Sequence, residues 1–263
     1  MQKEVSILIP HYKTLKMTKL CLELIKKNTD LNDVDVIVID NGSKDDSSEY
    51  LRTVDWIILI TRETIEGEGG VSAHSNALDL AVANVDTPYV LSIHTDTFVI
   101  SPKWLDYLLK QIERDENIAG VGSWKLEYSP FYQQILRKVE RFFRVNIWYP
   151  IIGKRAKKSD GVGDNYYYLR SHCALYRTDK VRAHTQGFGD GDQVAGKVMH
   201  QKLVDAGFEM VFLESDELSK YIRHLNHATV ILNPELHRNG VEKPRQIKRI
   251  RKELRDIEAK LGL

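Results

Sequence analysis

The stretch Tyr89-Val90-Leu91-Ser92-Ile93-His94-Thr95-Asp96-Thr97-Phe98 decides the fold that we predict for this chain. Its first half is rich in apolar and β-branched side chains, which is the pattern of a buried strand. The run then breaks into His94, Thr95 and Asp96, three polar residues that a protein core seldom holds. Open α/β sheets bind their ligands at the carboxyl ends of such strands, so we expect a site here.

His94 and Asp96 have side chains that together suit a divalent cation. Carboxylate oxygen is a ligand for Mg²⁺ or Mn²⁺, and imidazole is a ligand for Mn²⁺ or Zn²⁺. A second interpretation stays open for this stretch alone, because Asp and Thr also end strands by hydrogen bonding to their own backbone.

Composition narrows the class of protein. A chain of 263 residues is long enough for one α/β domain or two small ones. Its 38 Lys and Arg nearly balance 37 Asp and Glu, so no global basic field points to nucleic acid. Cys21 and Cys173 fit no zinc spacing, and we expect both in the core of a protein from a reducing compartment. With no signal peptide or membrane span in the sequence, we expect a cytoplasmic protein.

Strand, helix and strand patterns follow one another at the start of the chain. Val5–Pro10 is a β-branched run, Thr18 can cap an amphipathic helix, and Val34–Asp40 repeats the strand pattern. This order predicts a parallel βαβ unit. Polar residues end both strands, in Pro10-His11-Tyr12 and Asp40-Asn41-Gly42-Ser43, although Asp40 beside Gly42 also fits a turn.

A glycine-rich loop separates the next predicted strand from a helix. The apolar run Trp56–Ile60 is followed by Glu66-Gly67-Glu68-Gly69-Gly70 and a helical pattern over 73–81 that includes Asn76. Backbone N–H groups at such a helix start can bind phosphate, whereas glycine content alone fits a flexible loop equally well. Ser101-Pro102 then caps another predicted helix, and 118–122 reads as a strand.

The composition of the sequence changes between residues 126 and 158, where aromatic and aliphatic residues alternate with Lys and Arg. A basic amphipathic helix of this kind can lie on an anionic membrane or cover an acceptor groove. Packing on the sheet with a solvated basic face is the alternative.

Two further polar clusters follow a predicted strand at 171–176. Asp190 and Asp192 lie at the start of a helix predicted to end at Gly207, where both carboxylates can also serve only as caps. His224 and His227 stand in a polar run that suggests a metal or phosphate site or two structural histidines. The tail over 245–261 is predicted to be a charged helix.

Four of these pieces, in this order, resemble the family 2 glycosyltransferases of the GT-A fold. They are the strand Val5–Pro10, the run Val36–Asp45 with Asp-Asn-Gly-Ser, Asn76-Ala77-Leu78, and the strand that ends at Asp96. The resemblance covers residues 4–125 well and 170–230 loosely. It implies a single Rossmann-like α/β domain over 1–240, with a mixed, mostly parallel sheet flanked by helices. Residues 1–125 would be the nucleotide-binding half, 126–240 the acceptor and catalytic half, and 241–263 a charged C-terminal helix.

The resemblance also implies which residues bind the donor and the metal. The nucleotide-sugar residues would be Pro10, Tyr12, Asp40, Asn41, Asn76, His94 and Thr95, with Asp40 at the base. Asp96 would be the last carboxylate of the DxD motif, and His224 would complete the metal shell. The chain departs from the motif at its first position, where His94 replaces an acid and removes one negative charge.

By the same resemblance, the reaction is inverting transfer from a UDP- or dTDP-sugar to a hydroxyl of a glycan or glycolipid, assisted by Mn²⁺ or Mg²⁺. Asp192 would be the general base and Asp190 the second choice, on a helix about four residues longer than usual for the family, close to one turn. We expect no nucleic-acid partner, and peripheral membrane contact through 131–158 and a homodimer stay open. The alternatives are a GT-A-like domain without catalysis and a nucleotidyltransferase, although His11-Tyr12-Lys13-Thr14 lacks the glycine- and lysine-rich loop of the latter.

Overall fold

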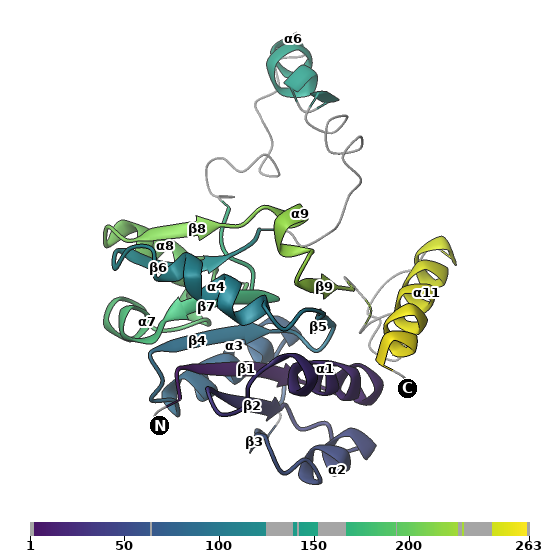
Figure 1. The fold of residues 1–263 in the computed structure, drawn as a ribbon. Coiled ribbons are helices and arrows are strands. Elements are labelled where there is room, and N and C mark those ends of the chain that lie inside the picture. The colour runs from purple at the N-terminus through teal and green to yellow at the C-terminus, as the bar shows by residue number, and fades with distance from the viewer. Residues whose placement is uncertain are drawn as a thin grey trace.

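A mixed seven-stranded sheet with helices on both faces forms the body of the protein (Figure 1). The structure is a computed structural model that describes residues 3–63, 65–124, 139–140, 142–151, 167–192, 194–225, 228 and 244–261. The strands of the sheet are β1 (Val5–His11), β2 (Val34–Asp40), β3 (Ile58–Thr61), β4 (Tyr89–Ile93), β6 (Ile118–Gly122), β7 (Cys173–Arg177) and β8 (Glu209–Phe212).

The strand order is β3-β2-β1-β4-β7-β6-β8. β1, β2, β3 and β4 are parallel, while β7 runs antiparallel to both of its neighbours, β4 and β6. A separate antiparallel pair joins β5 (Thr97–Val99) to β9 (Ile222–His224). The sheet is therefore α/β and mostly parallel, as the sequence predicts.

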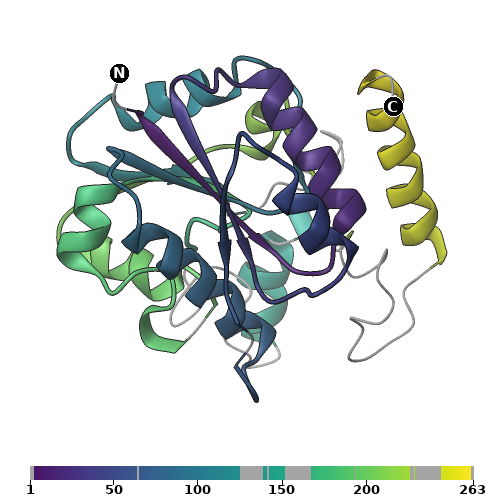
Figure 2. The same ribbon diagram turned by 90° about the horizontal axis from the view of Figure 1, so that it is seen from below.

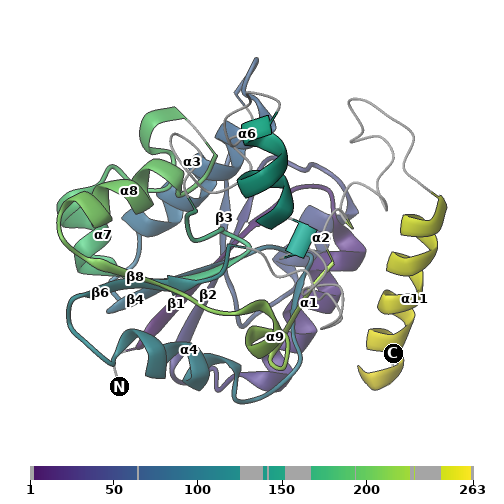
Figure 3. The same ribbon diagram turned by 90° about the horizontal axis from the view of Figure 1, so that it is seen from above.

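The helices lie in two layers, one on each face of the sheet (Figure 3). They are α1 (Leu15–Asn28), α2 (Asp46–Arg52), α3 (Gly70–Ala83), α4 (Trp104–Ile112), α6 (Tyr149–Ile151), α7 (Thr178–His184), α8 (Lys197–Asp205), α9 (Ser215–Leu218) and α11 (Pro244–Leu261), with a π-helical turn at Arg144–Trp148 and a 3-10 turn at Asp190–Asp192. α1, α4, α9 and α11 contribute to the core on one face, and α3, α7 and α8 to the core on the other.

Strand periodicity explains why there are two cores. In β1, Val5, Ile7 and Ile9 belong to the first cluster and Leu8 belongs to the second, because successive side chains of a strand point to opposite faces. All residues of β1 are buried, which is the pattern of a central parallel strand covered on both sides.

The first βαβ unit forms as predicted, with Val5–His11 paired in parallel with Val34–Asp40. The predicted cap of its helix is wrong. α1 begins at Leu15, so Thr18 lies inside the first turns, where it is buried and its Oγ1 is 2.8 Å from Nδ1 of His11. The hydroxyl serves a buried histidine instead of the helix start.

Three other predicted boundaries move by a few residues. The strand predicted at 56–60 is Ile58–Thr61, and α3 begins at Gly70 instead of residue 73. Ser101-Pro102 forms a turn before α4, in which Oγ of Ser101 accepts a hydrogen bond from the backbone N–H of Lys103, and the helix begins at Trp104. These shifts do not change the order of the elements.

The helix predicted to follow Asp192 begins five residues later, at Lys197. Gly191, inside the Asp190–Asp192 turn, and Gly196, directly before α8, have φ of +72° and +76°, a left-handed conformation that interrupts an α-helix. The predicted start of the longer helix is therefore wrong, since α8 covers only Lys197–Asp205. At the other end the prediction holds, since α8 closes at Gly207 with the hydrogen bonds of a Schellman motif.

The C-terminal helix α11 lies beside α1 in two perpendicular views (Figures 1 and 2). Ile250, Leu254 and Ile257 recur at helical spacing, are buried, and belong to the core cluster that includes α1. Lys16 in α1 also pairs with Glu258 at 2.7 Å. The predicted charged helix thus buries one apolar face against the domain.

Most of the basic amphipathic stretch at 126–158 lies outside the described residues; within it, 142–151 is helical. Among the helices that the structure describes, none has the length and apolar character needed to cross a membrane.

We predict that Gly187→Ala destabilises the fold more than Gly207→Ala. Both glycines have positive φ, +104° and +91°, which costs an alanine about 1–2 kcal/mol. A Cβ at Gly207 meets open space, whereas one at Gly187 overlaps the carboxylate of Asp79 and adds about 1–3 kcal/mol of overpacking. Urea unfolding of the two variants measures the difference, and equal losses would contradict the assigned contact.

Candidate functional site

The carboxyl ends of β1, β2 and β4 meet at one edge of the sheet. His11 pairs with Asp40 at the ends of β1 and β2, and the parallel register carries β4 to the same edge, where Ile93 leads into His94. The polar residues that follow three separate predicted strands are thus brought together. This confirms the geometric basis of the sequence prediction.

Asp96 is the central carboxylate of this edge. The residue is 6% exposed, and its Oδ1 accepts no hydrogen bond from any described residue. Nδ1 of His224 lies 3.4 Å from this oxygen and Nδ1 of His94 lies 3.9 Å from it. Burial raises the pKa of Asp96 to about 7, because the charged form of a carboxyl is disfavoured away from water, and a hydrogen bond to its own backbone offsets only part of this effect.

The β5–β9 pair explains why His224, distant in sequence, reaches Asp96. Thr97 and His224 are paired in register, and Oγ1 of Thr97 is 3.1 Å from Nδ1 of His224. The backbone N–H of Leu225 also donates to the carbonyl of Asp96 at 2.9 Å. The predicted neighbours Asp96 and His224 are therefore held together by backbone pairing. His227, the other histidine of that run, lies outside the described residues.

Four histidine rings form a cluster in which two members, His94 and His224, face the carboxylate of Asp96. His94 makes edge contacts with His74 at 4.8 Å and His172 at 6.3 Å between ring centroids, and His172 stacks on His224 at 4.8 Å. Burial lowers the pKa of His94 and of His172 well below the ordinary value and that of His74 to about 4. These rings are neutral at physiological pH and can offer nitrogen lone pairs.

Serine hydroxyls orient the same rings. Oγ of Ser171 is 3.1 Å from Nε2 of both His74 and His94, and Oγ of Ser123 is 3.2 Å from Nε2 of His172. With Nε2 of His94 held by Ser171, its Nδ1 is the nitrogen that faces Asp96.

Sequence analysis missed His74 and His172 as site residues. His172 precedes its strand, and it reaches the carboxyl edge only because β7 is antiparallel to β4, with Cys173 opposite Ile93. His74 lies on α3, one turn into the helix. Neither His74 nor His172 follows a strand, so a search for polar residues after strands does not find them.

Asp40 is bound by the residues of its own loop. Its carboxylate accepts from the backbone N–H of Ser43 at 3.0 Å and from the hydroxyl of Ser48. Burial alone would raise the pKa of Asp40, but these hydrogen bonds outweigh it and lower the pKa. Ser43 in turn accepts from the backbone N–H of Lys13, so Asp40 fixes the loops after β1 and β2 relative to each other.

Arg62, directly after β3, links the loop after β2 to the loop before α3. Its guanidinium binds Oδ1 of Asn41 at 3.3 Å and forms a two-point ion pair with Glu68. Glu68 also accepts from the amide of Asn76 at 2.7 Å. Asn41 and Asn76, both predicted to bind the nucleotide, are thus connected through the Arg62–Glu68 ion pair, which we did not predict. Arg62 does follow a strand directly, which is the pattern that we used to find site residues.

The remaining predicted nucleotide residues differ in exposure. Pro10 is buried inside β1 and Tyr12, two residues later, is 38% exposed with the Lys13 ammonium 5.3 Å from its ring centre. Thr95 is buried, with its Oγ1 3.5 Å from that of Thr14. Of these residues, Tyr12 offers an aromatic ring at the surface.

Asp190 is engaged within the protein. One oxygen accepts from the backbone N–H of Gln186 at 3.1 Å, and the carboxylate pairs with Nζ of Lys202 at 2.8 Å. The side chain of Asp192 is outside the described part of the chain. Asp79 on α3 fastens this loop to the domain by accepting from the N–H groups of Phe188 and Gly189.

The donor atoms at the edge fit a divalent metal. A buried carboxylate oxygen without a hydrogen-bond partner among the described residues, beside the imidazoles of His94 and His224, is a mixed oxygen and nitrogen ligand set, which suits Mn²⁺. Within the described part of the chain, no three His, Cys, Asp or Glu side chains form a group that could hold an ion by themselves. A metal here would therefore need further ligands, and substrate phosphate oxygens are common ones.

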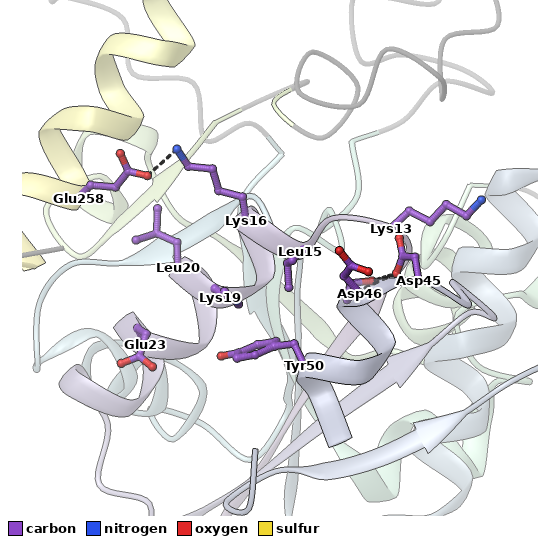
Figure 4. A pocket seen from close by; sticks show the side chains of 11 residues that line it. Lys13, Leu15, Lys16, Lys19, Leu20, Glu23, Asp45, Asp46, Tyr50 and Glu258 are labelled. Carbon is purple, nitrogen blue, oxygen red and sulfur yellow. Dashed lines mark hydrogen bonds and ion pairs between the residues drawn. The ribbon is translucent and has the colours of Figure 1, made fainter. Parts of the chain in front are cut away.

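A cleft of about 1090 Å³ lies elsewhere, between α1, α2 and α11 (Figure 4). Lys13, Lys16 and Lys19 line it together with Glu23, Asp45, Asp46 and Glu258, and the ammonium of Lys19 lies 4.8 Å from the ring centre of Tyr50. None of the predicted site residues lines this cleft. Its mixed charges favour neither cationic nor anionic ligands.

Comparison with known sequences identifies the family. The sequence model described as glycosyl transferase family 2 matches residues 6–185. The chain belongs to this family. It is also 25% identical over 190 residues to a teichoic acid poly(glycerol phosphate) polymerase of Staphylococcus epidermidis, an alignment that covers 71% of this chain and 24% of the relative. This family 2 chain thus spans about a quarter of the length of that relative.

Comparison with solved structures bears on the fold. A mannosyltransferase of Pyrobaculum calidifontis, solved in complex with GDP-Man and Mn²⁺, aligns with a TM-score of 0.53 and 18% identity, over 100% of this chain and 71% of the other. A glucosyl-3-phosphoglycerate synthase of Mycobacterium tuberculosis, in complex with UDP, aligns with a TM-score of 0.49 and 15% identity over 99% of this chain and 81% of the other. The first alignment confirms the GT-A architecture that the sequence resemblance implied.

We predict that the metal-free protein loses stability as the pH falls from 6.5 toward 4. Burial lowers the pKa of His11, His74, His94, His172 and His200. In that window the unfolded chain binds protons at these histidines that the folded chain does not, and each contributes up to about 1.4 kcal/mol per pH unit.

Asp96 opposes this trend, because its raised pKa makes the folded state bind the extra proton between pH 3.8 and about 7. Glu4 and Asp79, whose pKa burial also raises, act in the same direction as Asp96, and the five histidines outnumber these three carboxyls. Urea midpoints at pH 7 and pH 5 test the prediction, with His200→Gln expected to reduce the slope. A midpoint that does not change with pH would contradict it.

Proposed function

We propose that this chain transfers a sugar from a nucleoside diphosphate sugar, such as a UDP- or dTDP-sugar, to a hydroxyl of a glycan or glycolipid, with inversion and with a divalent metal. The observation that carries the proposal is the buried Oδ1 of Asp96, which has no hydrogen-bond partner among the described residues and faces His224 and His94. Membership of glycosyl transferase family 2 supports the reaction class.

Asp96 and His224 would hold the metal, which when bound neutralises charge on the departing diphosphate. The Pyrobaculum mannosyltransferase, which shares the fold, was solved with GDP-Man and Mn²⁺, and this supports the proposal that a divalent metal and a nucleoside diphosphate sugar bind together. His94 lies on the same side of Asp96 as a neutral ring, so the site has one carboxylate where a DxD motif has two. Imidazole in place of the first acid favours Mn²⁺ over Mg²⁺.

The donor's nucleoside would lie against the loops after β1 and β2. Asp40 and the ion pair of Arg62 with Glu68 fix these loops before any ligand binds, so little ordering entropy is lost on binding. Tyr12 is the exposed aromatic ring on which a base can stack. Cytoplasmic location, where such donors would be available, is part of the same proposal.

The acceptor hydroxyl would lose its proton to Asp192. Asp190, the second choice, already pairs with Lys202 and caps its own turn, which supports the original order of the two carboxylates. A role in polysaccharide or glycoconjugate synthesis is supported by the similarity to the teichoic acid polymerase.

We predict that Asp96→Asn weakens Mn²⁺-dependent binding of UDP by at least about 100-fold, since even residues that only orient a metal ligand change metal affinity about 10- to 100-fold. His224→Asn should also weaken it, whereas His227→Asn should not. Calorimetry with UDP and Mn²⁺ measures each variant. His200→Asn, a buried histidine on α8, is the matched control. An affinity of Asp96→Asn equal to that of the wild type, or equal effects of His224→Asn and His200→Asn, would refute the ligand assignment.

We predict that Asp192 acts in catalysis and that Asp190 stabilises the fold. Asp192→Asn should lower turnover about 10²- to 10⁴-fold with donor affinity unchanged. Asp190→Asn should instead lower the free energy of unfolding by about 1–3 kcal/mol, because it removes the charge that pairs with Lys202. Turnover, donor affinity and urea unfolding of both variants decide the matter. Retained turnover in Asp192→Asn would reject it as the base.

A GT-A-like domain that binds a nucleotide or glycan without catalysis is the second candidate. It is favoured by His94 at the first DxD position and by the lack of a three-ligand group among the described side chains. Release of nucleoside diphosphate from a panel of sugar nucleotides with Mn²⁺ distinguishes the two functions. Release that disappears in Asp96→Asn supports a transferase, and binding of a donor without any release supports the second candidate.

A further inference from the structure

A helical segment between β6 and β7 exposes large apolar side chains. Its described residues are 139–140 and 142–151, called here the 139–151 segment. Six of its side chains are between 43% and 71% exposed: Val139, Phe142, Phe143, Ile147, Trp148 and Ile151. Figure 1 shows the helical part of the segment standing away from the sheet, beyond β8.

Spacing along the helix places much of this surface on one side. Val139, Phe143, Ile147 and Ile151 recur every four residues, which aligns them along a helical segment. Phe142 makes an edge contact with Phe143, and Trp148 is 59% exposed. Single exposed apolar residues are ordinary on a protein surface. Six exposed apolar side chains within one short helical segment, three of them aromatic, mark an interaction surface.

The same stretch of sequence is strongly basic. Residues 131–158 contain eight Lys and Arg and one acid, Glu140, while the rest of the chain contains 30 Lys and Arg and 36 Asp and Glu. A chain that is nearly neutral overall thus has an excess of positive charge in the stretch of sequence that contains these exposed apolar side chains.

We propose that the 139–151 segment docks the protein peripherally on an anionic lipid bilayer. Its apolar side chains would enter the boundary between headgroups and acyl chains, and the Lys and Arg of the same stretch of sequence would pair with lipid phosphates. Aromatic rings, Trp above all, favour this interfacial depth. The inference is independent of the proposed function, because a chain without transferase activity would bind such a bilayer equally well.

Charge complementarity favours a bilayer over a second copy of the chain. Two such segments facing each other would bring like charges together, which is unfavourable. An anionic membrane supplies both the apolar layer and the opposite charge.

Vesicle binding tests the proposal. We expect the full chain to sediment with vesicles of equal parts phosphatidylglycerol and phosphatidylcholine at low salt, and not with phosphatidylcholine alone. High salt should weaken binding because it screens the charges. The fluorescence of Trp148 should shift to the blue on vesicles, and this shift should be absent from Trp148→Phe, which keeps an aromatic ring and should still bind.

Two double variants provide the matched comparison. Phe143→Ser with Trp148→Ser should reduce vesicle binding at least about tenfold, since two interfacial anchors are lost. Ile58→Ser with Val204→Ser changes two apolar residues, 48% and 42% exposed, on other elements and should bind as the wild type does. Unchanged thermal unfolding of the variants would show that they are folded.

Three outcomes would overturn the proposal. The first is a wild type that stays in solution with anionic vesicles at low salt, and the second is undiminished binding by Phe143→Ser with Trp148→Ser. The third is a wild type that ignores vesicles but sediments in the ultracentrifuge as a dimer, which the same double variant converts to a monomer. That result would assign the segment to contact between copies of the chain.

Discussion

The burial of Asp96 at the carboxyl end of β4 is the constraint on which the site depends. The β4 strand is paired on both sides, by β1 and β7, so the chain leaving it has a fixed direction. The short β5 strand then pairs with β9, and this pairing brings His224 beside the carboxylate. A carboxylate held by so much backbone pairing cannot turn outward to water, and its unpaired oxygen raises the free energy of the folded state unless a cation binds.

The surroundings of Asp96 fit this interpretation. Four imidazoles and two serines form the polar cluster at this edge, and burial lowers the pKa of three of the rings, those of His74, His94 and His172. A lysine or arginine at hydrogen-bonding distance would stabilise the charged form of Asp96 permanently and would occupy the oxygen that a metal would otherwise bind. The loops after β2 and β3 show the opposite arrangement, because Asp40 accepts hydrogen bonds from Ser43 and Ser48, and Glu68 pairs with Arg62. Asp40 and Glu68 thus hold their loops in place, whereas Oδ1 of Asp96 has no hydrogen-bond partner among the described residues.

The sequence predicts the parallel half of the molecule well because its signals are local. Buried strands such as Val34–Asp40 are continuous apolar runs, and each polar residue after a strand falls at the same edge by the rules of parallel sheets. The position of His172 could not be predicted in this way, since it depends on the antiparallel direction of β7, which no local pattern specifies. The helix predicted to start at Asp190 and Asp192 and to end at Gly207 begins only at Lys197. Positive φ at Gly191 and Gly196, which composition alone does not reveal, breaks that helix.

Thermal unfolding with a panel of sugar nucleotides, with and without Mn²⁺, tests the central claim most directly. A ligand at 100 times its dissociation constant adds about 2.7 kcal/mol to the stability of the folded state, enough to raise the unfolding temperature clearly. If Asp96 binds a metal that the donor's diphosphate helps to hold, one or more nucleoside diphosphate sugars should raise the unfolding temperature only when Mn²⁺ is present. Stabilisation by the same nucleotides to the same extent with Mn²⁺ removed, or by none of them with Mn²⁺ added, would contradict the account.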